Sequence, residues 1–150
     1  LNILKKYKVP FVIQHSQGTP ENMQKNPRYK NELLDIYDFF EKKIKLLRSK
    51  GIKHNKIILD PGIGFGKNLS QNIEIMKKIN QFKFKGYGLL LGSSRKSWIN
   101  GIDKSDSNQR LGGSLASALF CYQKGVDIFR VHDVKETTQS LKVFKQLCSK

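Results

Sequence analysis

Two hydrophobic patterns alternate along this chain. Short runs of consecutive apolar residues predict four buried strands, over about 9–15, 56–60, 87–91 and 126–132. Apolar residues three and four positions apart predict helices over about 31–50, 70–81 and 111–125, and a last helix after Asp133. Gly51 suits the position after a helix end, and Asp133 and Glu136 have the spacing of a helix N-cap and its partner.

The expected order is a strand followed by a helix, four times, with no domain boundary inside the chain. Such alternation is typical of a parallel sheet. Two α/β architectures remain open: a small doubly wound sheet, or half of a TIM-type (β/α)8 barrel. A complete barrel takes about 250 residues, so four units in 150 residues fit half a barrel. The spacing alone does not separate the two.

Composition and charge exclude some classes of function but do not distinguish between the two folds. The formal net charge is +16, and only five of the 28 basic residues are arginine. The lysines lack interleaved aromatic residues, so nucleic-acid binding is not expected as the main role, and attraction of an anionic substrate is favoured. No apolar run reaches the roughly 18 residues of a membrane span, and no signal peptide is visible.

Two further observations concern the setting of the chain. Cys121 and Cys148 lack the spacing of a metal site and are expected to be free thiols in a reducing cytosol. The chain begins with Leu1 rather than methionine, so we expect a processed product or a piece of a longer protein.

The stretch 57–68 (IILDPGIGFGKN) is the most informative one. Asp60 stands at the carboxyl end of a predicted strand, where parallel α/β proteins bind ligands. The following glycines let the backbone come close to whatever Asp60 holds. Asp-Pro-Gly is also common turn chemistry, so a purely structural interpretation remains open at this point.

The other predicted strands also end in polar residues. The first strand ends in Gln14, His15, Ser16 and Gln17, the third in Ser94, Arg95 and Lys96, and the fourth in Arg130, His132 and Asp133. Individually, each of these residues could instead take part in a salt bridge or be a solvated charge at the rim of the sheet. Together they suggest a ligand with an anionic end held by Lys96, Arg130 and His132, and a donor-rich edge whose N–H groups Asp60 accepts.

The common nucleotide and catalytic motifs are not matched. A P-loop needs other residues at Pro61 and Asn68, and the glycines of 62–66 lack the spacing of the dinucleotide fingerprint. No serine stands at a nucleophile elbow to accompany the three histidines. The sequence offers no metal-ligand cluster.

Several motifs in order resemble dihydropteroate synthase, over nearly all of the chain. They are LDPGIGFGKN over 59–68, GSSRKS over 92–97 and RVHDV over 130–134, together with QGTPENMQ over 17–24 and RLGGSLA over 110–116. The resemblance implies a (β/α)8 barrel that joins p-aminobenzoate to a hydroxymethyl-dihydropterin diphosphate and releases diphosphate. It further implies that residues 1–150 are the second half of the pterin-binding domain, with strands five to eight, and that the first half is missing.

The resemblance also implies roles for individual residues. Asp60 matches the residue that holds the pterin's amino-pyrimidine edge, and Lys96 the lysine between pterin and p-aminobenzoate. Arg130 and His132 match the diphosphate-binding pair, with Val131 between them in the same substrate-binding stretch. Phe65 and Gly92 match pocket walls. Lys96, Arg130 and His132 are the expected catalytic residues.

By the same resemblance, the Mg²⁺ ligand belongs to the missing first half, and a cytoplasmic homodimer through the later helices is expected. The small residues of the 111–122 helix suit close packing against a strand or a partner subunit. Ser16 stands where many members have a bulkier residue, and a half barrel should expose two open sheet edges. Two alternatives stay open: a pterin-binding methyltransferase domain, and an inactive basic half-barrel that binds anionic partners.

Overall fold

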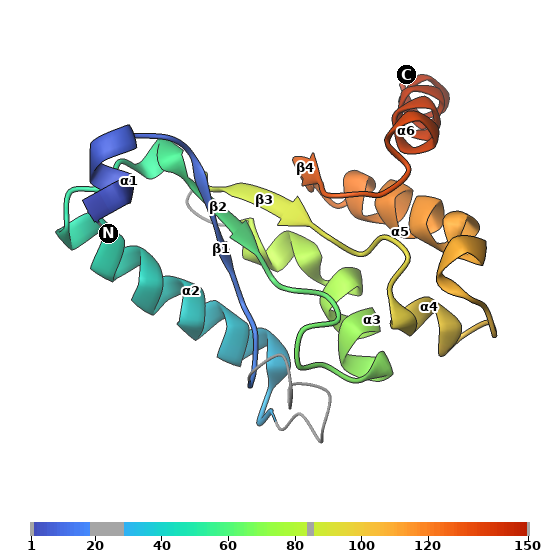
Figure 1. Ribbon diagram of the computed structural model, residues 1–150, viewed down its shortest axis with the longest axis horizontal. Coiled ribbons are helices and arrows are strands. Elements are labelled where there is room, and N and C mark those ends of the chain that lie inside the picture. Colours follow the sequence, from blue (N-terminus) through green and yellow to red (C-terminus); the bar gives the residue numbers. More distant parts are fainter. Residues whose placement is uncertain (1, 19–28, 84–85, 150) are drawn as a thin grey trace.

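The computed structural model describes residues 2–18, 29–83 and 86–149. In these ranges the chain alternates strands and helices (Figure 1). The strands are β1 (Phe11–Gln14), β2 (Ile57–Asp60), β3 (Gly88–Leu91) and β4 (Ile128–Phe129). The helices are α1 (Asn2–Tyr7), α2 (Glu32–Ser49), α3 (Leu69–Lys77), α4 (Ser97–Asn100), α5 (Leu111–Gln123) and α6 (Val134–Cys148). Short 3₁₀ turns lie at His54–Lys56, Ile79–Phe82 and Ser107–Gln109.

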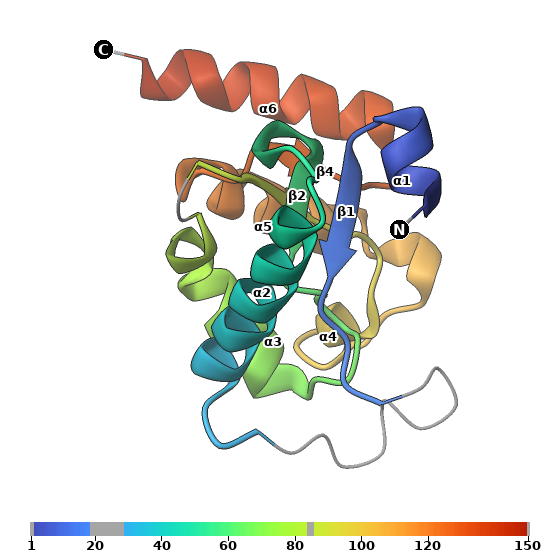
Figure 2. The same cartoon turned by 90° about the vertical axis from the view of Figure 1, so that its left-hand side faces the viewer.

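The four strands form one parallel sheet in the order β1-β2-β3-β4. A doubly wound sheet reverses its strand order at a switch point, whereas a (β/α)8 barrel adds strands in chain order. Helices α2, α3 and α5 lie along one side of the sheet, and α6 follows beside α5 (Figures 1 and 2). The topology is therefore that of a barrel segment, which resolves the two architectures left open by the sequence.

Helix α2 shows how local chemistry fixes an element. The side chain of Asn31 accepts the backbone N–H groups of Leu33 and Leu34, each at 3.1 Å, which satisfies two free donors of the first turn. At the other end Gly51 adopts a φ of 82°, which ends the helix. The predicted bounds of this helix are confirmed within one residue.

The core lies between the sheet and these helices. Phe40 of α2 is fully buried, and its ring meets that of Phe82 edge to face, with 6.0 Å between centroids. Leu59 of β2 and Leu89 of β3 are also fully buried and face this layer. The core therefore fixes β2 and β3 most firmly, and these two strands carry the central part of the candidate site.

Two predicted elements differ from the structure, and two short helices were not predicted. The fourth strand, predicted over 126–132, keeps ladder geometry only at β4, so Arg130 and His132 lie in the loop that follows it. The second helix ends at Lys77 and continues as a 3₁₀ turn, Ile79–Phe82. Helices α1 and α4 were not predicted, because six and four residues are too short to show a helical period.

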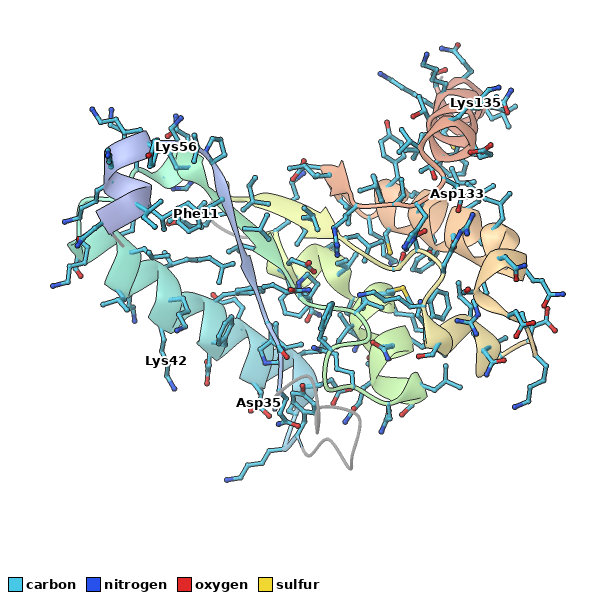
Figure 3. The ribbon with its side chains drawn as sticks, in the orientation of Figure 1. Phe11, Asp35, Lys42, Lys56, Asp133 and Lys135 are labelled. Atoms are coloured by element: carbon cyan, nitrogen blue, oxygen red, sulfur yellow. The ribbon has the colours of Figure 1, made fainter. Side chains whose placement is uncertain are left out.

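The start of α6 also differs in its chemistry. Asp133 occupies the N-cap position, but its side chain accepts no N–H of the helix. Its carboxylate instead pairs with the guanidinium of Arg95, whose Nε lies 2.9 Å from Oδ2. Figure 3 shows Asp133 where the chain enters α6. An ion pair outcompetes the weaker capping bond here.

Some of the small residues of α5 pack inside the chain. Ser117 Oγ lies 2.8 Å from Ser93 Oγ, and a Cβ on Gly113 would lie 2.7 Å from Ile99. These residues pack against the loop after β3 and against α4. Gly112 and Ala116 are exposed, so a homodimer through this helix stays a prediction.

Three further expectations concern edges, membranes and thiols. In the described sheet β1 and β4 each have one neighbouring strand, as expected for half a barrel. Within the described ranges, no helix combines the length and apolarity that crossing a bilayer requires. Cys121 and Cys148 are both free thiols, as predicted.

Candidate functional site

Asp60 is buried at the carboxyl end of β2, with 5% of its surface exposed. Its Oδ1 accepts the backbone N–H of Gly62 at 2.8 Å. Burial raises the pKa of the Asp60 carboxyl, while that N–H bond and the charges of Lys96, Lys67 and Arg130 act in the opposite direction. A buried carboxylate facing cations is a candidate acceptor for a ligand's N–H groups.

The glycine loop after Asp60 lets the neighbouring strand come close. Gly62 and Gly66 have φ values of 72° and 67°, in the left-handed region that favours glycine. A Cβ on Gly62 would lie 1.9 Å from the carbonyl oxygen of His15, and one on Gly66 would lie 2.3 Å from that of Gln17. We expected these glycines to admit a ligand, but these two admit the chain that follows β1.

Lys96 reaches across from the loop after β3 to the same place. Its Nζ donates to the carbonyl oxygen of Ile63 and lies 4.1 Å from the ring centroid of Phe65, a cation–π contact. Burial lowers the pKa of Lys96 to about 8, opposed by Asp60 and reinforced by Arg130. Lys96 and Phe65, both predicted site residues, are therefore in direct contact.

A hollow of about 460 Å³ opens at the carboxyl ends of β3 and β4. Its lining includes five predicted site residues: Gly92, Lys96, Arg130, Val131 and His132. Ser94, Arg95 and Ser107 complete the lining. Asp60 and Phe65 do not line this hollow, but both interact with Lys96, which does. Ser107 was not predicted, because it lies in a polar loop without a pattern.

Ser94 holds the backbone and the ring of His132. The hydroxyl oxygen of Ser94 accepts the backbone N–H of His132 at 3.3 Å and lies 3.0 Å from its Nδ1. This hydroxyl can donate to Nδ1 or accept from it, depending on the tautomer of the ring. Because Ser94 bonds at Nδ1, Nε2 is the ring nitrogen left for a ligand.

Arg95 serves the framework of the site. It has a φ of 56°, its N–H donates to Ser114 Oγ at 2.8 Å, and its carbonyl accepts from Arg110 at 3.0 Å. Its guanidinium pairs with Asp133, which lowers the pKa of that carboxyl. Arg95 and Asp133, both candidates for ligand contact by position, therefore tie the loop after β3 to the start of α6.

Lys67 and His15 form a second buried pair under the glycine loop. Lys67 is 2% exposed, and its Nζ lies 3.1 Å from His15 Nδ1. Burial lowers the pKa of Lys67 to about 7 and that of His15 to about 4. Lys67 was missing from the predicted site, because a lysine before a helix N-cap looks like a solvated charge. The one available signal was its place inside a glycine-rich turn.

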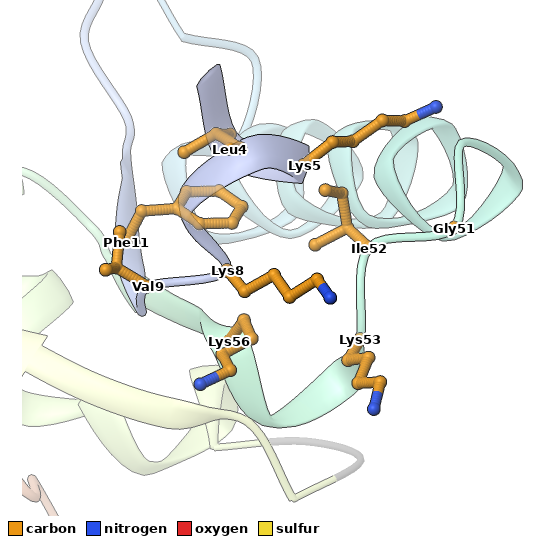
Figure 4. Close-up of a pocket in the computed structure, with 9 residues that line it drawn as sticks. All are labelled: Leu4, Lys5, Lys8, Val9, Phe11, Gly51, Ile52, Lys53 and Lys56. Carbon is orange, nitrogen blue, oxygen red and sulfur yellow. The ribbon is translucent and has the colours of Figure 1, made fainter. Parts of the chain in front are cut away.

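A second hollow, also of about 460 Å³, lies at the opposite end of the strands (Figure 4). Its apolar floor includes Phe11 and Ile52. Its charged lining residues are all lysines: Lys5, Lys8, Lys53 and Lys56. It contains no predicted site residue and no acid–base pair, so the carboxyl-end hollow is the candidate site.

The described residues do not fit a Mg²⁺ ion. No group of three or more His, Cys, Asp or Glu side chains gathers within the ranges that the structure describes. Mg²⁺ prefers oxygen ligands in octahedral geometry, whereas Asp60 is surrounded by cations. The expectation that the Mg²⁺ ligand belongs to another part of the protein stays a prediction.

Pro20, Met23 and Gln24 of the QGTPENMQ motif over 17–24 lie outside the described residues.

Sequence comparison places these residues in a wider context. The family model described as "Pterin binding enzyme" matches residues 1–132. The dihydropteroate synthase of Haemophilus influenzae is 42% identical over 140 residues, which cover 93% of this chain and 51% of that protein. That of Escherichia coli is 38% identical over 141 residues, covering 94% and 50%. The chain spans about half the length of the curated relatives it matches.

Solved structures agree with the sequence matches. Dihydropteroate synthase of Yersinia pestis with a sulfonamide drug complex superposes with a TM-score of 0.92 at 38% identity, covering 95% of this chain and 52% of that one. The Thermus thermophilus enzyme in complex with 6HMPPP superposes with a TM-score of 0.85 at 33% identity, covering 92% and 55%. The likeness therefore extends over nearly the whole chain, in sequence and in fold.

Proposed function

This chain belongs to the pterin-binding enzyme family as a homologue of dihydropteroate synthase, and we propose that it forms strands five to eight of that enzyme's (β/α)8 barrel. The proposed reaction joins p-aminobenzoate to (7,8-dihydropterin-6-yl)methyl diphosphate and gives 7,8-dihydropteroate and diphosphate. Because the chain spans half of its relatives, the activity is proposed for the complete protein that contains it.

One observation carries the proposal: the buried carboxylate of Asp60 and the cations Lys96 and Arg130 interact at neighbouring strand ends. The proposed pterin has a donor-rich amino-pyrimidine edge and an anionic diphosphate at its other end. Asp60 would accept N–H groups of that edge. Lys96, Arg130 and His132 would bind the diphosphate, with Phe65, Gly92 and Val131 as parts of the pocket wall.

The chemistry suits these charges. The bond between the pterin methylene carbon and the diphosphate oxygen breaks, the arylamine nitrogen bonds to that carbon, and the amine loses a proton. Negative charge grows on the departing diphosphate, so fixed cations beside it stabilise the transition state more than the ground state. His132, held in place by Ser94 at Nδ1, would add a hydrogen bond from Nε2 to the same group.

The remaining partners follow from the family and are part of this proposal. They are p-aminobenzoate, Mg²⁺ bound by the other half of the protein, and a second copy in a cytoplasmic homodimer. Neither nucleic acid nor membrane is among them. The proposed dimer would form through the later helices, among them α5, whose small residues Gly112 and Ala116 are exposed.

The test is an assay of the complete protein with both substrates. We expect dihydropteroate and diphosphate in equal amounts, and competition between p-aminobenzoate and a sulfonamide. Comparing its activity with that of the 150-residue chain assayed alone shows how much the missing half contributes to turnover. Pterin binding without diphosphate release would instead favour a methyltransferase domain. Absence of pterin binding, with salt-sensitive binding of DNA or RNA, would favour a basic binding module.

A further inference from the structure

Lys67 is a buried lysine that the proposed reaction does not use. Its Nζ donates to the carbonyl oxygens of Gly62 and Phe65, each at 2.9 Å, and lies 3.1 Å from Nδ1 of His15. Lysine is almost never fully buried unless its charge has partners. These three contacts use every hydrogen of an ammonium group. The amine is therefore held inside the loop, and does not point to solvent or to the hollow.

The two carbonyls belong to residues that orient the site. The N–H of Gly62 donates to Asp60 Oδ1 at 2.8 Å. The ring of Phe65 lies 4.1 Å from the ammonium of Lys96. Fixing Gly62 and Phe65 thus fixes one neighbour of Asp60 and one neighbour of Lys96. Lys67 binds the carbonyls of both residues from the buried side of the loop.

We propose that Lys67 is a positioning residue for pterin binding: it holds the 62–65 loop in the shape that orients Asp60 and Lys96, and it places a positive charge near Asp60. The inference rests on the proposed function, because it assumes that Asp60 binds the pterin. It adds a residue that contacts no substrate and acts through the loop and through its charge on Asp60.

The charge has a consequence of its own. Lys96 after β3, Lys67 in the loop after β2 and Arg130 after β4 all act to lower the pKa of Asp60. The pKa of Lys67 is about 7, so this lysine is charged at the lower pH values at which a carboxyl titrates. His15, at the end of β1, has a pKa of about 4 and adds little charge above that value. Without Lys67, Asp60 should take up its proton at higher pH.

Two substitutions separate the effect of the hydrogen bonds to the loop from the effect of the positive charge. Lys67→Met keeps the length and removes both the donors and the charge. Lys67→Gln removes the charge and keeps an NH₂ group for the two carbonyls, on a side chain one bond shorter. Lys77→Met, at an exposed position in the last turn of α3, is the matched control. The measurement is the Kd of the complete protein for 6-hydroxymethylpterin, which lacks the diphosphate and cannot react, by calorimetry from pH 4 to pH 9.

We expect Lys67→Met to weaken binding about tenfold at pH 8, and to move the acid limb of the profile to higher pH. Lys67→Gln should recover most of the affinity at pH 8 and keep the displaced acid limb. If Lys67→Met does not fold, the acid limb of the Lys67→Gln profile alone tests the inference. Wild-type affinity and an unmoved acid limb in the variants would overturn the inference. A wild-type protein that binds no pterin would overturn the proposed function instead.

Discussion

The hydroxyl of Ser94 lies 3.0 Å from Nδ1 of His132 and accepts that residue's backbone N–H at 3.3 Å. One side chain at the end of β3 thereby fixes both the backbone and the ring of a residue after β4. This bond, together with the Arg95–Asp133 ion pair, holds two loops in one arrangement. His132 is thereby held in one position at the hollow and can bind an anion without reorganising.

Removing the Ser94 hydroxyl should weaken binding of the diphosphate group more than binding of the pterin ring. We expect Ser94→Ala to raise the KM for the dihydropterin diphosphate about tenfold, because the backbone and the ring of His132 lose the hydroxyl that holds them. Binding of 6-hydroxymethylpterin, which has no diphosphate, should change little. Ser97→Ala, at an exposed position, is the control. Equal losses for both ligands would show that Ser94 does not act through His132.

The carboxylate of Asp60 should be required as an anion. We expect Asp60→Asn to weaken binding of 6-hydroxymethylpterin by about a hundredfold, because the amide accepts with one oxygen only. In the wild type, burial raises the pKa of Asp60. Binding should therefore be complete at neutral pH and weaken as the pH falls through that raised value. Asp103→Asn, on an exposed loop, should leave Kd unchanged. Calorimetry across pH measures both effects.

Lys96 should set the basic limit of turnover. Its pKa is lowered to about 8 by burial, so the ammonium is present below that pH and is lost as the pH rises through it. We expect kcat/KM to fall above about pH 8. Lys96→Arg should remove this basic limb, because a guanidinium stays charged, whereas Lys96→Met should lower kcat about a hundredfold at every pH. A basic limb that persists in the arginine variant would assign it to another group.

The loop after Asp60 should tolerate no side chain at Gly62. We expect Gly62→Ala to lower the free energy of unfolding by more than about 3 kcal/mol, because a Cβ would lie 1.9 Å from the His15 carbonyl oxygen. Gly112→Ala is the matched control, since nothing lies within 4 Å of its Cβ. That change should be neutral or stabilising by up to about 1 kcal/mol. Urea unfolding of both variants of the complete protein tests the difference.

Much of the fold could be predicted because its signals are local. Asn31 before α2, the apolar spacing along it and Gly51 after it mark this helix in one continuous stretch of the chain. The two-residue β4 was overestimated, because an apolar run shows burial but not where ladder pairing stops. Strand order was likewise undetermined, since it depends on contacts between distant segments.

The candidate site was predictable as far as its residues follow strands. Lys96, Arg130 and His132 were expected together, and they line one hollow. Lys67 was missed, because its partners are backbone carbonyls and a histidine 52 residues away. The N-cap position of Asp133 was predicted correctly, but its side chain does not cap the helix, because Arg95 binds it from 38 residues away. Pairings at such separations leave no pattern in a sequence.

The unpaired outer strands have a consequence for how the complete enzyme could be assembled. In the described sheet β1 and β4 present backbone groups that a further strand would satisfy. A second polypeptide carrying the remaining strands offers such groups, so no covalent link between the halves is required for the barrel to close. Under the proposed function, two separately synthesised pieces are expected to restore the activity in trans, and growth of a folate-requiring host would report each successful pairing.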